Sequence, residues 1–144
     1  MRIDDPHSGL EFLDRDQCLA LLHERSGKVG RLAFVEGVHP TVLPVNFVMD
    51  GNGVALRTGM GLKLSVALRR AAVAFQVDRF DEDERTGWSV LVRGTSEVVD
   101  RHDDLDRLNS LGLVPWANEA MKPVWVRISA DLVTGRRIDL LTPR

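Results

Sequence analysis

Short strand-like runs, each ending in turn residues, fill most of this sequence and constrain its fold more than any other feature. The strongest turn is Asp50-Gly51-Asn52-Gly53, which is typical of a β-hairpin because glycine and asparagine readily adopt positive φ angles. The strand-like runs are Val29–Val35, Thr41–Met49, Val54–Thr58, Val73–Phe80, Trp88–Val99, Val124–Ser129 and Leu132–Ile138. Helix-like runs cover Arg15–Arg25, Leu64–Ala71 and Asp103–Leu111. We predict a mainly β fold, an antiparallel β-barrel of six or seven strands with flanking helices, rather than alternating βαβ units.

The composition fits one globular domain over residues 1–144, with residues 1–13 as an N-terminal arm. Of the 144 residues, 44% are hydrophobic and 28% are charged, which is enough for a real core. The net charge of −2 argues against a nucleic-acid partner, because no basic excess offsets phosphates. The lone Cys18 rules out an internal disulfide, and the scattered histidines predict no metal site. No apolar run reaches the length of a signal peptide or membrane span, so we expect a cytoplasmic protein without a membrane partner.

The segment from Arg57 to Lys63 has the composition of an anion-binding turn. A strand ends there in Arg57, Thr58 and Gly59, and Lys63 opens a helix-like run. The hydroxyl and backbone N–H groups would donate hydrogen bonds, and the two cations would add full charges. The pattern is not a P-loop, since Leu64 follows the lysine, so we favour a mononucleotide phosphate. An ordinary strand-to-helix turn with solvated cations remains the alternative.

Two strand segments are candidates for contact with a flat heterocycle. Pro44 lies inside a strand-like run, which predicts either an edge or a place where a ligand replaces the neighbouring strand. The backbone of Val45, Asn46 and Phe47 would then face the ligand; the alternative is an edge strand with a local hydrogen bond from Asn46. Trp88 and Ser89 begin another strand and offer a ring and a hydroxyl, although tryptophan is more often core filler.

No catalytic constellation of side chains can be assembled, so the catalytic residues stay unassigned. Neither a Ser-His-Asp nor a Cys-His arrangement emerges from the sequence. A cofactor that brings its own reactivity therefore fits better than a protein nucleophile.

The order of six motifs resembles that of the pyridoxamine 5′-phosphate oxidase-like, FMN-binding split β-barrel proteins. The resemblance covers about residues 15–139 and is to the small bacterial branch that includes nitroimidazole-resistance proteins. The motifs are Gly30-Arg31-Leu32-Ala33, Pro44-Val45-Asn46-Phe47, Arg57-Thr58-Gly59 through Lys63, Phe75-Gln76-Val77-Asp78, Gly87-Trp88-Ser89-Val90-Leu91-Val92-Arg93-Gly94 and Thr134-Gly135-Arg136-Arg137.

The resemblance implies a homodimer that binds FMN at the subunit interface. Arg57, Thr58 and Lys63 would hold the phosphate, and Gly59 and Gly61 would form the turn. The remaining implied contacts to the flavin come from Pro44, Val45, Asn46, Phe47, Trp88 and Ser89, with Arg136 and Arg137 reaching in from the other subunit.

The implied activity is that of an FMN-dependent oxidoreductase acting on a small organic or nitroaromatic substrate. The alternatives are a reductase that uses a deazaflavin coenzyme, which related branches bind, and a non-catalytic flavin carrier or sensor. True pyridoxamine phosphate oxidases carry a C-terminal Arg- and His-containing segment that has no counterpart from Leu140 to Arg144. We therefore expect a substrate other than a vitamin B6 phosphate.

Overall fold

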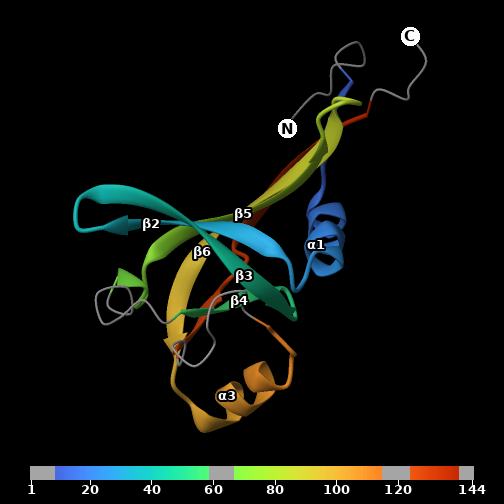
Figure 1. Cartoon of the computed structure of the whole chain (residues 1–144). Coiled ribbons are helices and arrows are strands. Elements are labelled where there is room, and N and C mark those ends of the chain that lie inside the picture. Colours follow the sequence, from blue (N-terminus) through green and yellow to red (C-terminus); the bar gives the residue numbers. More distant parts are fainter. Residues whose placement is uncertain (1–8, 59–66, 115–123, 140–144) are drawn as a thin grey trace.

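The computed structural model describes residues 9–58, 67–114 and 124–139 (Figure 1). In chain order its elements are β1 (Leu10–Leu13), α1 (Arg15–Glu24), β2 (Val29–Glu36), β3 (His39–Asp50), β4 (Gly53–Thr58), β5 (Ala72–Asp81), β6 (Thr86–Val99), α3 (His102–Asn109), β7 (Val124–Ile128) and β8 (Leu132–Ile138). The seven predicted strands correspond to β2–β8, and an eighth, β1, lies in the predicted arm. Most of the predicted helix over Leu64–Ala71 lies outside the described residues. Within the described ranges, no helix is long and apolar enough to cross a bilayer.

Six strands close into an antiparallel barrel, which confirms the predicted fold class. The order is β6-β5-β2-β3-β4-β7, and β7 pairs again with β6. β8 and β1 extend the sheet beyond β6. The predicted hairpin joins β3 to β4 through the pair Asp50 and Gly53, and Gly51 has a φ of 59°.

The long strand β6 belongs to both halves of the barrel. It pairs with β8 up to Arg93 and with β7 from Ser96 onward. Gly94 lies between these two pairings, and a Cβ atom there would overlap the carbonyl oxygen of Ser129. A glycine is therefore needed where the strand passes from one half to the other.

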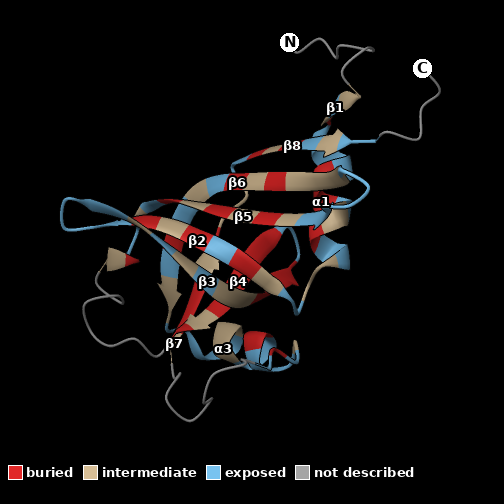
Figure 2. Ribbon diagram, turned by 45° about the horizontal axis from the view of Figure 1, so that its top comes forward, coloured by how far each residue is buried: buried red, intermediate tan, exposed pale blue. Residues whose placement is uncertain are grey.

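Alternation along the strands separates the barrel interior from its outer surface (Figure 2). The rings of Phe47 and Phe75 meet edge to face inside the barrel, with centroids 5.0 Å apart and planes at 66°. α1 packs beside β8 and starts with a capping box in which Asp14 and Gln17 bond each other's backbone N–H. Cys18 of α1 is fully buried in the core, and this burial raises the pKa of its thiol.

A smaller core lies outside the barrel, where α3 covers β3, β4 and β7. Its buried residues are Val48, Ala55, Leu108, Leu113 and Trp125. An ion-pair cluster lies beside it: the Asp50 carboxylate accepts hydrogen bonds from Arg107 at 3.0 Å and from Arg127 at 2.8 Å. The cluster ties α3 and β7 to the β3–β4 hairpin.

Candidate functional site

The candidate segment from Pro44 to Phe47 lies where the barrel is split. β3 pairs with β2 as far as Asn46, but it pairs with β4 only from Phe47 to Asp50. Within the described chain, the part of β3 that precedes Phe47 therefore has an open edge on the side away from β2. This confirms the edge predicted from Pro44, since proline cannot donate to a ladder.

The four predicted residues of β3 divide between two faces. Val45 and Phe47 pack in the barrel interior. Alternation places Pro44 and Asn46 on the outer face of the barrel, where Pro44 is exposed and Asn46 is half-buried with its Nδ2 atom covered. Phe47 also uses its backbone within the protein, because its N–H donates to the Lys28 carbonyl and its carbonyl accepts from the Gly27 N–H. The Phe47 side chain thus belongs to the core, and a contact between Phe47 and a flavin stays a prediction.

Arg57 and Thr58 form the end of β4, as the sequence indicates. The Arg57 guanidinium carbon lies 5.5 Å from the centre of the Trp125 ring, which fixes it against the smaller core. Thr58 is buried, on the opposite face of the strand from Arg57. Two further predicted phosphate-binding residues, Gly59 and Lys63, lie outside the described residues, as does Gly61.

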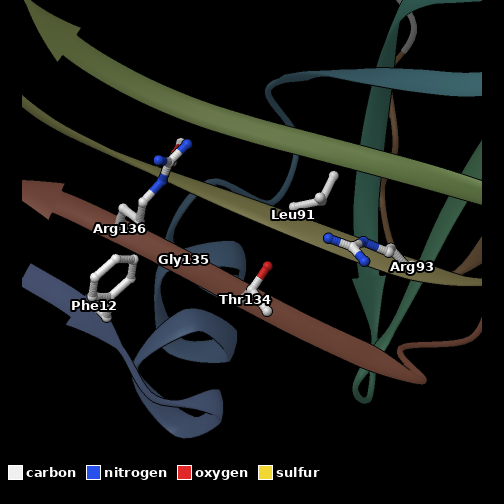
Figure 3. Close-up of a pocket in the computed structure, with 7 residues that line it drawn as sticks. Phe12, Leu91, Arg93, Thr134, Gly135 and Arg136 are labelled. Carbon is white, nitrogen blue, oxygen red and sulfur yellow. The ribbon is translucent and has the colours of Figure 1, made fainter. Parts of the chain in front are cut away.

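Trp88 and Ser89 are also separated by strand alternation. Trp88 packs partly against the barrel core and lines a broad surface hollow with Arg31 and Asp78. Ser89 lies on the outer face of β6 and lines a pocket of about 320 Å³ between β6, β8 and β1 (Figure 3). The other lining residues are Phe12, Leu91, Arg93, Thr134, Gly135 and Arg136.

Strand register explains how this pocket forms from residues far apart in the chain. Arg136 lies opposite both Ser89 and Phe12, and Thr134 lies opposite Leu91. Arg137 points to the other face and pairs with Glu11 at 2.6 Å. Of the two arginines in the C-terminal motif, only Arg136 therefore reaches the pocket.

Sequence reasoning missed Phe12, Leu91, Arg93 and Thr134 as pocket residues. Leu91 and Arg93 follow Ser89 at every second position, which is the spacing of one strand face. This spacing could have identified them, but only after β8 and β1 were known to lie beside β6. Phe12 carries no signal of its own, because it lies in a segment read as an arm.

The pocket and the open edge of β3 lie far apart within one chain. Paired residues connect them across five strands, in the order Thr134, Leu91, Gln76, Arg31 and Pro44. Four strand spacings amount to roughly 19 Å along the sheet. Polar contacts occupy the middle of this row: Arg31 pairs with Asp78 at 3.1 Å, and Gln76 donates to Asp78 at 2.7 Å.

Comparison with known proteins fixes the family. A family model for pyridoxamine 5′-phosphate oxidase matches residues 14–137. The chain belongs to this family. The chain is also similar to the uncharacterised protein Rv0080 of Mycobacterium tuberculosis, which is 40% identical over 96% of this chain and 94% of its own length.

Solved structures agree with this assignment. An FAD-binding protein from Mycobacterium smegmatis is 32% identical, with a TM-score of 0.74 over 90% of this chain and 100% of its own. A conserved protein of unknown function from Corynebacterium diphtheriae is 36% identical, with a TM-score of 0.76 over 91% of this chain and 99% of its own.

Proposed function

We propose that this protein is a flavin-dependent oxidoreductase that binds FMN or FAD and acts on a small organic or nitroaromatic substrate. The observation that carries the proposal is the similarity to the FAD-binding protein of M. smegmatis, which the chain matches over that protein's whole length. A flavin supplies hydride or electron transfer by its own chemistry, which agrees with a sequence that shows neither a Ser-His-Asp nor a Cys-His arrangement.

The residues at the split of the barrel fit a flavin nucleotide. Arg57 offers a guanidinium at the end of β4, and the Thr58 hydroxyl lies next to it in the chain. Together with Gly59 and Lys63 they would hold the phosphate through charge-assisted hydrogen bonds. The open edge of β3 would present the backbone of Val45 and the outward side chains of Pro44 and Asn46 to the ring system.

A homodimer would complete this site. Ser89 and Arg136 lie several strands away from Pro44 within one chain, so a single flavin ring does not span both groups. A two-fold pair places the same patch of each subunit against the other, so the pocket of one chain would meet the open edge of its partner. Val35 and Val42, which are 55% and 63% exposed, lie on adjacent strands of this outer surface and would be covered by the second copy.

The visible spectrum and mass of any chromophore released from the purified protein test the cofactor. We expect a flavin spectrum, or saturable binding of added FMN or FAD. A colourless protein that binds neither contradicts the proposal, and binding of a deazaflavin coenzyme instead favours that alternative. Turnover with a reduced nicotinamide and an electron acceptor separates an oxidoreductase from a carrier. Light scattering should give twice the monomer mass of 16.1 kDa if the dimer forms.

Replacing Arg57 by alanine should weaken flavin binding by about tenfold to a hundredfold, because one charge-assisted contact to the phosphate is lost. Fluorescence titration of FMN measures the change, and Arg57→Lys should recover part of the affinity. Arg85→Gln, in the turn between β5 and β6, removes one arginine elsewhere and should leave the affinity unchanged. Equal FMN affinities for wild type and Arg57→Ala would show that the phosphate lies elsewhere.

A further inference from the structure

Arg57, the cation that the proposed function assigns to the flavin phosphate, lies against an aromatic ring of the protein. Arg57 and Trp125 are paired neighbours on β4 and β7, and the guanidinium carbon lies 5.5 Å from the centre of the Trp125 ring. At this distance the ring attracts the cation through its quadrupole. A guanidinium can meet a ring by its face while its N–H donors, which lie in its plane, bond an anion. The contact therefore restricts where the Arg57 side chain can point and still allows it to bind a phosphate.

The Trp125 ring is itself held in one orientation. Trp125 is 3% exposed and belongs to the smaller core that α3 covers (Figure 2). Its indole N–H donates to Oδ1 of Asn109, the last residue of α3, at 2.8 Å. α3 is in turn anchored by Arg107, which donates to the Asp50 carboxylate. A continuous set of contacts thus runs from α3 through Trp125 to Arg57.

The value of such support follows from the flexibility of an arginine side chain. Its rotatable bonds are immobilised when it binds a ligand, at a cost in conformational entropy. A side chain that packing already holds in its binding orientation loses less freedom on binding, so the affinity is higher. Thr58 lies on the opposite face of β4 from Arg57, whereas Trp125 lies on the same face as Arg57 and can restrain it.

We propose that Trp125 and Asn109 are positioning residues for the flavin phosphate. Trp125 holds the Arg57 guanidinium in its binding orientation, and Asn109 fixes the Trp125 ring. The inference rests on the proposed function, in which Arg57 binds the phosphate, and it assigns a role to α3 that the proposed function does not include.

Paired titrations with FMN and riboflavin test the inference, because riboflavin has the same ring system and ribityl chain but no phosphate. In flavin fluorescence, Trp125→Leu should lower the FMN affinity about tenfold and the riboflavin affinity by less than about twofold. Trp125→Phe keeps an aromatic face but loses the N–H, and Asn109→Ala removes its acceptor, so each should lower the FMN affinity about threefold. Asn109 is exposed, so Asn109→Ala provides the test even if a change at the buried Trp125 prevents folding.

Two control variants separate positioning from general loosening of the smaller core. Leu108→Ala opens a cavity in that core, and Ser110→Ala removes a hydroxyl that donates to the Arg107 carbonyl at the same end of α3. Both should keep the FMN affinity within about twofold of wild type, although Leu108→Ala should lower the midpoint of urea denaturation.

A double-mutant cycle shows whether Trp125 and Asn109 act through Arg57. In an Arg57→Ala background, Trp125→Phe and Asn109→Ala should have no further effect on the FMN affinity. A purely structural role of the two residues would instead give losses that add to that of Arg57→Ala.

Four results would overturn the inference: unchanged FMN affinity in Trp125→Phe and Asn109→Ala, an equal loss for riboflavin, an equal loss in Leu108→Ala, or additivity with Arg57→Ala. If the wild type binds no flavin, or if Arg57→Ala leaves FMN binding unchanged, the proposed phosphate contact fails and the inference fails with it. If Arg57→Ala weakens FMN binding but the Trp125 and Asn109 variants do not, the inference alone fails and the proposed function stands.

Discussion

Replacing Phe75 by alanine is expected to lower the free energy of unfolding by about 4 kcal/mol, because it leaves a cavity at the centre of the barrel. Phe75 is fully buried and meets Phe47 edge to face. Urea denaturation measures the loss. Phe80→Ala is the matched control, since Phe80 lies on the same strand but is 53% exposed, and it should cost less than about 1 kcal/mol. Similar costs at both positions would mean that the ring of Phe75 does not support the core as described.

Gly30 provides a second test of the same packing. A Cβ atom on Gly30 would overlap the Phe75 ring, so Gly30→Ala alone should destabilise the protein by about 2 kcal/mol. In a Phe75→Ala background the added methyl group would enter the cavity, so the same change should cost nothing or restore stability. A double-mutant cycle by urea denaturation should therefore show strong coupling. If the losses in the free energy of unfolding from Gly30→Ala and Phe75→Ala simply add, the two residues are not in contact.

Replacing Asp50 by asparagine is also expected to have a large effect. It should lower the free energy of unfolding by about 3 kcal/mol. The Asp50 side chain is 9% exposed and accepts from both Arg107 and Arg127, so the substitution leaves two guanidinium groups without their shared counter-charge. Asp104→Asn is the control: Asp104 also pairs with Arg107, but its side chain is 38% exposed, and its loss should cost less than about 1 kcal/mol. A small effect at Asp50 would show that the cluster does not anchor α3.

The contribution of the Asp50 carboxylate to the free energy of unfolding should decrease as the pH falls into the acid range. Hydrogen bonds from Arg107, assisted by Arg127 and opposed in part by burial, hold the pKa of Asp50 below its ordinary value of 3.8. A carboxyl whose pKa is lower in the folded state stabilises the fold above its unfolded pKa, and this stabilisation is lost as the pH falls through the folded pKa. The difference between wild type and Asp50→Asn should therefore be largest near neutral pH and narrow below about pH 4. Urea denaturation at several pH values measures it, and a gap that widens in acid would contradict the pKa direction.

Much of the fold could be predicted because its signals are local. The Asp50–Gly53 turn identified the β3–β4 hairpin, and the helical run from Arg15 ended within one residue of α1. The strand β1 was missed because four residues next to an arm carry little periodic signal, and its pairing with β8 is non-local.

The candidate site was predicted less completely, because neighbours in the sequence do not share a face of a strand. Val45 and Phe47 turn into the barrel while Pro44 and Asn46 turn outward, and Trp88 and Ser89 separate in the same way. The motifs located the strands that carry candidate residues, but alternation decided which side chains reach a surface.

The sequence by itself determined the succession of strands, the hairpin at Asp50–Gly53 and the family to which the chain belongs. Only the tertiary structure decided which residues meet. Arg93 and Arg136 line one pocket because β6 and β8 pair in a particular register. Ser89 lies three strand spacings, roughly 14 Å, from Pro44 across the sheet because β5 and β2 intervene. Such pairings join segments far apart in the chain through backbone hydrogen bonds, which any residue except proline can donate, so side-chain identity alone does not specify them.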